Sequence, residues 1–394
     1  FGWGEELIQI IDAEAAVDWR FVDLSAESPA QRESSIRRLR VADREEPYGL
    51  GSGSLFRVYL VSHGPADYLC LFSHHHSILD GWSNTVLLNR VHEIYEAIVS
   101  GLPTDSVPDR SYPAGQQYLQ EHRDDHSEFW RDALAVHDEG IDLQGLLSAE
   151  ARANGLRVEA TRRVEEMREL DVTLSGAQYD ALRRAARETG VTLNALFLYV
   201  WNKTLACYTG TDQTITGVVL SGRGIPVNDI DKSVGLFINT LPLIVDHGAD
   251  HETVLDGLRS VQEQINELNA RATVNLGELH EGADRLFDTL FIYENWPKIN
   301  ADGWQERLAV HMEGESEKLD YPLSVIVSET PDAIRLRLVY AAELFDERLM
   351  SGMLDLQRHL LTEVAADRER RWRDTVLLSA DQFLELDAAL NPPT

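Results

Sequence analysis

Short apolar segments rich in β-branched residues alternate with longer segments of helical periodicity along this chain, in both halves of the sequence. Strands of this kind need a covering layer, and helices with one apolar side provide it. The chain has 394 residues, which is too long for one small core and suggests about two domains. We therefore predict an α/β protein of two lobes, each with its own strands and helices, rather than one large domain.

The first half predicts one lobe over residues 1–140. Ser28, Pro29 and Gln31 have the spacing of a capping box with proline at the first helical position, which predicts a helix over residues 29–43. The turn sequence HGPAD separates two apolar runs and indicates a strand pair. Strands are expected at residues 7–12, 19–24, 55–62 and 68–73, and further helices at residues 83–99 and within 112–134.

The second half predicts another lobe over residues 161–375. A polar segment without strong periodicity precedes it and predicts a linker at 141–160, and residues 376–394 are typical of an exit linker toward a downstream domain. Periodicity within the lobe predicts strands at 169–174, 214–220, 288–293, 323–327 and 334–340, another in SVGLFINTLPLIV, and helices at 175–188, 193–209, 252–272 and 348–365.

The charge balance excludes several classes of partner. Lys and Arg number 36 against 66 Asp and Glu, a formal net charge of −30. A surface this acidic repels phosphate backbones and anionic lipid, so we expect neither nucleic acid nor a membrane as partner. No apolar window reaches the length of a membrane span, and the first residues do not form a signal peptide. Cys70 and Cys207, the only cysteines, lie in apolar runs, which indicates a reducing, cytoplasmic location.

The sequence YLCLFSHHHSILDGWS places three histidines where an apolar strand ends. Alternate residues of a strand face the same way. If the strand persists, His74 and His76 share a face and His75 points to the other side. Gly-Trp-Ser then turns the chain toward a helix that Ser83 can cap. We therefore expect His76 at a strand-to-helix junction, where side chains often face a cleft.

Histidine titrates nearest to neutral pH among the side chains, so it suits a general base. Asp80 could accept a hydrogen bond from a ring nitrogen or pair with an arginine to brace the loop, and Gly81 could allow a conformation that a Cβ would oppose. A structural histidine and a metal site are the alternatives. Adjacent histidines on a strand diverge, and the chain lacks HExxH or Cys–His spacing, so we expect no metal.

Several motifs together resemble a known family. HHSILDGWS matches the HHxxxDG motif of condensation domains in non-ribosomal peptide synthetases. In the same order along the chain, VGLFINTLPL resembles the family's GxFVNT motif, and LFDTLFIYENWP resembles its FDTLFVFENYP stretch. YPAGQQYLQEHRDDHSEFW is similar, more loosely, to the fourth motif and the helix after it, and LLSADQ to the usual exit toward an adenylation domain. The resemblance covers essentially the whole chain.

The sequence departs from the family pattern in two places. The first two motifs, SxAQxR-like and RHExLRT-like, are absent, and FGWGEELIQII resembles what normally follows them. The start of the N-terminal lobe is therefore expected to be missing, and with it an arginine that commonly pairs with the motif aspartate, here Asp80. The region VNLGELHEGADRLF also lacks a clear HQDYPFE-like motif.

The resemblance implies a fold and a set of partners. The fold is two lobes related to chloramphenicol acetyltransferase, arranged as a V-shaped pseudodimer with the active site in a tunnel between them. Upstream and downstream peptidyl carrier proteins deliver substrates on phosphopantetheine arms, and an adenylation domain is adjacent. The acceptor amine attacks the donor thioester, and the domain itself binds no cofactor or metal.

The resemblance also implies roles for individual residues. His76, the second histidine of the motif, would deprotonate or position the acceptor amine. Gly81 would offer backbone contact near the reacting centre, Asp80 would brace the loop, and His75 would pack inward. Asn239, in FINT, is a candidate for lining the substrate tunnel, with a purely structural role as its alternative.

His74 extends the motif to HHHxxxDG, which resembles the β-lactam-forming condensation domain of nocardicin synthetase. That chemistry needs a second base. A seryl thioester would lose its α-proton and then water, the acceptor amine would add to the β-carbon of the resulting dehydroalanine, and the new secondary amine would close a four-membered ring. The alternative is that His74 has no chemical role.

The residues of the HHSILDGWS motif also bear on other functions of the same fold. An epimerization domain shares the histidines but usually departs from DGWS, and a heterocyclization domain would carry aspartates in their place. A non-catalytic recruitment domain usually loses the histidine pair. A stand-alone acyltransferase using only HxxxD is a further alternative, against which the linker-like tail speaks. We therefore predict an amide-forming condensation domain, with β-lactam closure as a possible elaboration.

Overall fold

The computed structural model describes residues 9–12, 15–51, 54–104, 107–135, 141–247, 253–275, 277, 285–297, 308, 310–314 and 317–377. The chain divides into two compact units. The N-terminal unit comprises Phe1–Tyr112 together with Asp231–Phe237, and the C-terminal unit comprises Pro113–Ile230 and Ile238–Thr394. A short segment of the second half of the sequence therefore belongs to the first unit.

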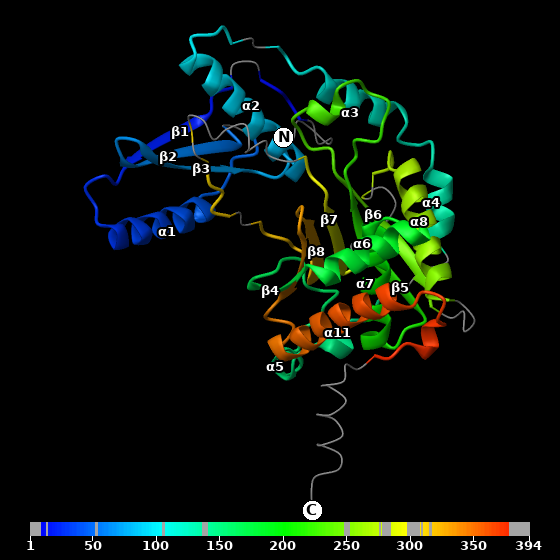
Figure 1. Ribbon diagram of the computed structural model, residues 1–394. Coiled ribbons are helices and arrows are strands. Elements are labelled where there is room, and N and C mark those ends of the chain that lie inside the picture. Colours follow the sequence, from blue (N-terminus) through cyan, green and yellow to red (C-terminus); the bar gives the residue numbers. More distant parts are fainter. Residues whose placement is uncertain are drawn as a thin grey trace, which may run out of the picture. The chain divides into compact units, whose positions relative to one another are not determined.

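A three-stranded sheet forms the centre of the N-terminal unit (Figure 1). β1 (Asp18–Asp23) runs parallel to β2 (Phe56–Gly64), and β2 pairs antiparallel with β3 (Asp67–His74). Helix α1 (Pro29–Glu45) connects β1 to β2 and packs Ile36 and Leu39 against the buried Tyr59 and Val61. Helix α2 (Gly81–Val99) follows the histidine run.

A six-stranded sheet forms the centre of the C-terminal unit, in the order β4-β9-β8-β7-β5-β6. Its two parallel pairings are β5 with β7 and β7 with β8, and the other neighbours are antiparallel. The strands are β4 (Met167–Ser175), β5 (Gln213–Leu220), β6 (Asn239–Asp246), β7 (Thr289–Glu294), β8 (Leu323–Glu329) and β9 (Ala333–Ala341).

Helix α7 (Leu193–Thr209) lies at the centre of the core of this unit, because its sequence is apolar on nearly every side and eleven consecutive residues from Ala195 to Leu205 are buried. The other helices are α3 (Ser111–Glu121), α4 (Ser127–Ala135), α5 (Ala149–Ala153), α6 (Ala177–Thr189), α8 (Val254–Ala270) and α11 (Glu347–Ala366), with 3₁₀ turns η1 (Gln144–Leu146), η2 (Ile230–Lys232) and η3 (Trp372–Asp374).

Most predicted elements are confirmed, and the bounds of α7 agree with the prediction at both ends. The capping box at the start of α1 is confirmed, since the Gln31 side chain accepts a hydrogen bond from the Ser28 backbone at 3.0 Å. The helical region within 112–134 consists of two helices, α3 and α4, and the strand expected in SVGLFINTLPLIV begins at Asn239. One expectation is wrong, because residues 9–12, the described part of the strand expected at 7–12, contain no strand.

The expected linker at 141–160 differs most from the structure. Ile141, Leu143, Leu146 and Leu147 are buried in the core of the C-terminal unit, and Ser148 caps α5. Its few apolar residues are spaced for a 3₁₀ turn and a short helix, which weak periodicity does not reveal. The first unit accordingly ends at Tyr112 rather than at residue 140. Of the expected exit linker, residues 378–394 lie outside the described residues.

Neither the disulfide-free interpretation nor the hydropathy analysis conflicts with the structure. Cys70 and Cys207 are both free. None of the described helices combines the length and the hydropathy that a bilayer-crossing segment requires.

Candidate active site

The histidine run begins on a strand and ends in a turn. β3 finishes at His74, His75 lies outside the strand, and residues 76–78 form a turn before Asp80 caps α2. The strand therefore does not persist to His76, so strand alternation does not place His74 and His76 on one face. The position of His74 is set by the sheet, whereas that of the exposed His76 is set by the turn.

His74 and His75 have different surroundings. His74 pairs in register with Phe56 of β2, and the two rings stack with centroids 6.2 Å apart. His75 donates its backbone N–H to Leu55 O at 3.0 Å. Its ring Nδ1 accepts from the Ser77 backbone N–H at 3.2 Å and lies 2.8 Å from the Ser77 hydroxyl. Because Nδ1 is an acceptor, the proton of the neutral ring is on Nε2.

Asp80 closes the turn at its other end. Its side chain is buried, with 1 % exposure, and its carboxylate accepts two backbone hydrogen bonds, from Ser83 N at 2.8 Å and from Phe237 N at 3.0 Å. Asp80 is thus the N-cap of α2, and the expectation that Ser83 caps this helix is wrong. The helix begins two residues earlier than predicted because aspartate caps as well as serine does.

Ser83 instead reinforces the same connection. Its hydroxyl donates to Gly235 O at 2.7 Å and accepts from Gly235 N at 3.0 Å. The Trp82 indole donates to Asp231 O at 2.8 Å. The start of α2 is therefore tied to the segment Asp231–Phe237, which contains the first half of VGLFINT. Two of the motifs that carry the family resemblance meet within the N-terminal unit.

Asp109, which lies between α2 and α3, also holds the segment Asp231–Phe237. One carboxylate oxygen accepts from the Ser233 hydroxyl at 2.7 Å and from Val234 N at 3.0 Å, and the other accepts from Ser111 N at 2.9 Å. Burial alone would raise the pKa of Asp109, but these hydrogen bonds from Ser233, Val234, Ser111 and Tyr112 outweigh it and lower the pKa. The charged form is therefore the one that the fold stabilises.

Gly235 is needed for close packing in this region. A Cβ at Gly235 would lie 2.1 Å from the ring of Tyr112, a separation that no side chain tolerates. Tyr112 in turn meets Phe237 edge to face, with centroids 5.2 Å apart. The glycine of VGLFINT thus permits the aromatic contact that packs Asp231–Phe237 into the unit.

Two further candidate residues each begin an element of the structure. Gly81 is the first residue of α2 and has helical backbone angles, so a positive φ is not what calls for glycine there. Asn239 begins β6 in the C-terminal unit, and its amide nitrogen donates to Ala272 O at 2.9 Å and Val274 O at 2.8 Å. These two bonds fix the chain that follows α8, which is a structural task.

No group of three His, Cys, Asp or Glu side chains within the described ranges is arranged to hold a metal ion. The sequence interpretation missed Asp109, Gly235, Tyr48 and Arg57. Asp109 carried a usable signal, since an aspartate shortly before Ser-Tyr-Pro, here two residues before the serine, is typical of a helix start. Arg57 also carried one, as a single charge inside the apolar strand LFRVYLV.

The family model described as "Condensation domain" matches residues 2–386. The chain therefore belongs to the condensation-domain family, the class of non-ribosomal peptide synthetase domains that form peptide bonds. This confirms the resemblance drawn from HHSILDGWS and the motifs that follow it.

The particular relatives are peptide synthetases. The chain is 38 % identical over 397 residues to N-(5-amino-5-carboxypentanoyl)-L-cysteinyl-D-valine synthase of Amycolatopsis lactamdurans, covering 98 % of this chain and 11 % of that protein. It is 36 % identical over 400 residues to the synthase of the same name from Penicillium rubens, with the same coverage. Bacitracin synthase 3 of Bacillus licheniformis is 25 % identical over 385 residues, 96 % of this chain and 6 % of that protein. The chain thus spans about a tenth or less of the length of these relatives.

Solved structures agree on the fold. The first condensation domain of the CDA synthetase matches with a TM-score of 0.70 at 20 % identity, over 94 % of this chain and 82 % of that one. The X-domain from teicoplanin biosynthesis matches with a TM-score of 0.74 at 21 % identity, over 94 % and 83 % of the two chains. The predicted two-lobed α/β fold of condensation domains is therefore confirmed, with one sheet in each unit.

Asp80 allows a graded test of the connection between α2 and the segment Asp231–Phe237. In Asp80→Asn, one of the two backbone N–H groups loses its acceptor whichever way the amide turns, so we expect a loss of about 1–3 kcal/mol in the free energy of unfolding. Asp80→Ala also removes the cap and should cost a further ~0.5–2 kcal/mol. Urea unfolding monitored by circular dichroism measures both.

The N-cap of α11 provides the matched control for this series. Asp346 accepts one backbone N–H, that of Leu349 at 2.9 Å. Asp346→Asn should therefore be nearly neutral and Asp346→Ala should cost only the cap. Equal losses in Asp80→Asn and Asp346→Asn would contradict the double role of Asp80.

Asp109 predicts a dependence of stability on acid. Its folded pKa lies below the unfolded value of about 3.9, so its contribution is complete above that pH and is lost as the pH falls through the folded pKa. Asp109→Asn should lower the stability at pH 7, and the difference from wild type should shrink between about pH 4 and pH 2. Urea unfolding at several pH values measures this. A difference that stays constant with pH would contradict the assignment, and Asp132→Asn, at an exposed position of α4, is the control.

Proposed function

We propose that this chain joins a carrier-bound donor acyl or peptidyl thioester to a carrier-bound acceptor amine, with His76 as the group that deprotonates or positions the amine. The observation that supports this most is the placement of His76. It is exposed, in a turn held on one side by the end of β3 and on the other by the buried Asp80. A base must be accessible and yet fixed, and this turn meets both requirements.

The reaction follows from these groups. The amine nitrogen attacks the thioester carbon, a C–N bond forms, and the C–S bond to the donor's phosphopantetheine arm breaks. The nitrogen loses one proton, which His76 accepts, and the departing thiolate takes one proton to become a thiol. Because neither oxidation nor reduction occurs, the reaction itself calls for no redox cofactor, and both phosphopantetheine arms arrive as parts of the substrates.

The partners follow from the class of relatives. The similar synthases are many times longer than this chain, and one structural match is to a four-domain non-ribosomal peptide synthetase. We propose upstream and downstream peptidyl carrier proteins and an adjacent adenylation domain as partners, in the cytoplasm. The similarity to synthases named for a 5-amino-5-carboxypentanoyl-cysteinyl-valine peptide makes donors of that kind the first to test.

A second candidate is β-lactam formation from a seryl donor, and the third histidine favours it. His74 is the last residue of β3, one residue ahead of the pair that defines the motif. As a second base it would remove the α-proton of the seryl thioester, water would leave, the acceptor amine would add to the β-carbon, and attack of the new secondary amine on the thioester would close the ring.

The two remaining alternatives are disfavoured by residues rather than by the fold. The X-domain match has the same fold, so the fold alone does not separate a recruitment domain from a catalytic one. The chain retains both His75 and His76, which a recruitment domain does not need. It also retains the Asp80–Ser83 arrangement that an epimerization domain usually lacks, here used to anchor α2.

His76→Ala tests the condensation function. With donor- and acceptor-loaded carrier proteins, wild type should release the amide product, and His76→Ala should lower the rate by about 10²-fold or more, the contribution typical of general acid–base catalysis. Product is read by mass spectrometry and the fold by circular dichroism. His359→Ala, a half-buried histidine on α11 whose ring lies 2.8 Å from Val376 O, is the control and should retain full activity. Full activity in His76→Ala would refute the assignment.

His74→Ala separates the two candidate functions. A peptidyl-seryl donor with an arylglycyl acceptor gives the ordinary peptide if the chain only condenses, and a product lighter by one water if it closes a ring. If wild type gives the ring and His74→Ala gives only the peptide, His74 is a second base. If both give the ordinary peptide at the same rate, β-lactam formation is excluded for these substrates.

A further inference from the structure

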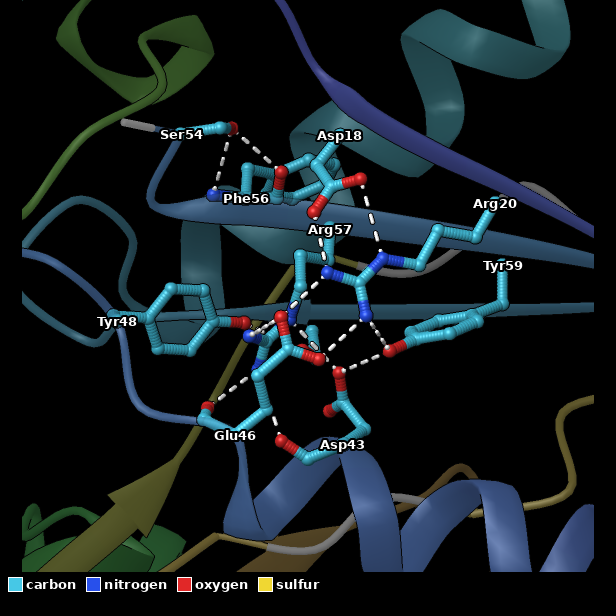
Figure 2. A network of polar contacts seen from close by, with 10 residues as sticks. Asp18, Arg20, Asp43, Glu46, Tyr48, Ser54, Phe56, Arg57 and Tyr59 are labelled. Carbon is cyan, nitrogen blue, oxygen red and sulfur yellow. Dashed lines mark hydrogen bonds and ion pairs between the residues drawn. The ribbon is translucent and has the colours of Figure 1, made fainter. Parts of the chain in front are cut away.

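A cluster of charged and aromatic side chains lies on strands β1 and β2 and at the end of α1 (Figure 2). Its centre is Arg57 of β2, which is 3 % exposed. Its guanidinium meets Asp43 Oδ1 at 2.9 Å and Glu46 Oε1 at 3.3 Å. The same group donates to the backbone carbonyls of Asp43 at 2.9 Å and Glu46 at 3.0 Å.

These contacts explain why the sequence places a charge inside an apolar strand. A buried guanidinium is strongly unfavourable unless it is paired and hydrogen-bonded. Arg57 also lies at the C-terminal end of α1, where carbonyls lack helical partners and a cation is favoured. Its contacts with Asp43 and Glu46 therefore fix the end of α1 relative to β2.

A second arginine strengthens this arrangement. Arg20 of β1 forms two 2.6 Å contacts with the carboxylate of Glu46 and a 2.8 Å hydrogen bond to the hydroxyl of Tyr59. The hydrogen bond from Arg20 holds the pKa of Glu46 near 2. The carboxylate that Arg57 shares is thus charged at all physiological pH values.

Tyr48 connects this cluster to the histidines. Its ring lies against the guanidinium of Arg57, 4.1 Å from ring centroid to Cζ, which is a cation–π geometry. Both residues are labelled in Figure 2. Its hydroxyl is hydrogen-bonded to the Ser73 hydroxyl. Ser73 is the cross-strand partner of Arg57. Tyr48 therefore contacts both members of one residue pair between β2 and β3.

Tyr48 also meets the residue at which the turn begins. The rings of Tyr48 and His75 meet edge to face, with centroids 6.0 Å apart and planes at 81°. His75 accepts from Ser77 N through Nδ1, and its carbonyl accepts from Ile78 N at 3.2 Å. The orientation of the His75 ring therefore sets the hydrogen bond to Ser77 N in the turn that carries His76.

We infer that Tyr48, held by the buried Arg57, is a positioning residue for this turn: it fixes the ring of His75 in the Nε2-protonated form and thereby fixes where His76 lies. This inference rests on the proposed role of His76. It extends the functional unit from the motif to a tyrosine and an arginine that precede it by about 20 to 30 residues in the sequence. A shift of about 1 Å in a catalytic group is enough to cost about 10²-fold in rate.

Tyr48→Leu tests the inference, because leucine fills part of the space but has neither the ring face for Arg57 nor the ring edge for His75. We expect kcat for amide formation to fall about 10- to 100-fold with KM for the donor carrier unchanged. Tyr48→Phe retains the ring and loses only the Ser73 hydrogen bond, so it should restore most of kcat. Ser73→Ala removes the same bond from the other side and should match Tyr48→Phe. Tyr68→Ala, at an exposed position of β3, is the control.

A second measurement does not depend on activity. In chain labelled with ¹³C,¹⁵N-histidine, the His75 signal is assigned by its loss in His75→Gln. Wild type and Tyr48→Phe should show one neutral tautomer with the proton on Nε2, and Tyr48→Leu should show a mixture of tautomers. If Tyr48→Leu does not fold, the test rests on Ser73→Ala and Tyr48→Phe. Both must then lower kcat, by less than the loss of about 10- to 100-fold expected for Tyr48→Leu.

The outcomes distinguish this inference from the proposed function. Full activity in His76→Ala refutes the proposed function whatever Tyr48 does. If His76→Ala is inactive while Tyr48→Leu keeps kcat within about twofold and keeps the wild-type tautomer of His75, the positioning role of Tyr48 is overturned and the proposed function stands.

Discussion

The carboxylate of Asp80 is the interaction on which the arrangement of the motifs depends. A single buried side chain accepts one backbone N–H from its own helix and one from Phe237, more than 150 residues later in the chain. The desolvation of a carboxylate is unfavourable by several kcal/mol unless strong donors replace the lost water. Aspartate suits this position because each of its two carboxylate oxygens accepts one of these backbone N–H groups, which a neutral amide cannot do. Asp80 fixes the turn that carries the histidines at the end where α2 begins, and the same carboxylate holds the VGLFINT segment.

Arg57 has the corresponding function at the other end of the turn. It is a buried cation among apolar neighbours, and its partners are partly carbonyls at the end of α1 and partly carboxylates. Two buried charges of opposite sign, Asp80 and Arg57, therefore bracket a stretch of about 20 residues. Buried charges contribute little net stability but strongly disfavour alternative arrangements, because any such arrangement leaves a charge unpaired. We interpret both as devices that specify one conformation of the histidine turn.

Much of this could be predicted from the sequence, because it depends on local pattern. The bounds of α7 follow from an uninterrupted apolar run ended by glycine, and the start of α1 follows from its capping box. The partners of Asp80 could not be derived, since the segment Asp231–Phe237 is remote in sequence and its contact is made by backbone groups that every residue possesses. The burial of residues 141–147 could not be predicted either, because a few spaced leucines in a polar segment give no periodic signal. The junction between strand and helix at His76 could be predicted from the sequence, but the end of the strand could not. A shared face for His74 and His76 requires the strand to continue, and pairing ends at His74 because β2 begins opposite it, at Phe56.

The fold and the site carry different information about function. A condensation domain and an X-domain match the chain about equally well at about 20 % identity, so these matches establish the arrangement of sheets and helices and not the chemistry. The difference between a catalytic and a non-catalytic domain of this fold must therefore lie in individual residues. The informative residues are those that are needed only to hold an accessible turn in one place. A histidine exposed at the tip of such a turn needs no buried cation or carboxylate for folding alone, since an ordinary strand-to-helix connection would be formed by solvated loop residues. We therefore propose that this turn is held for catalysis, because Arg57, Tyr48 and Asp80 order the segments that flank the exposed His76.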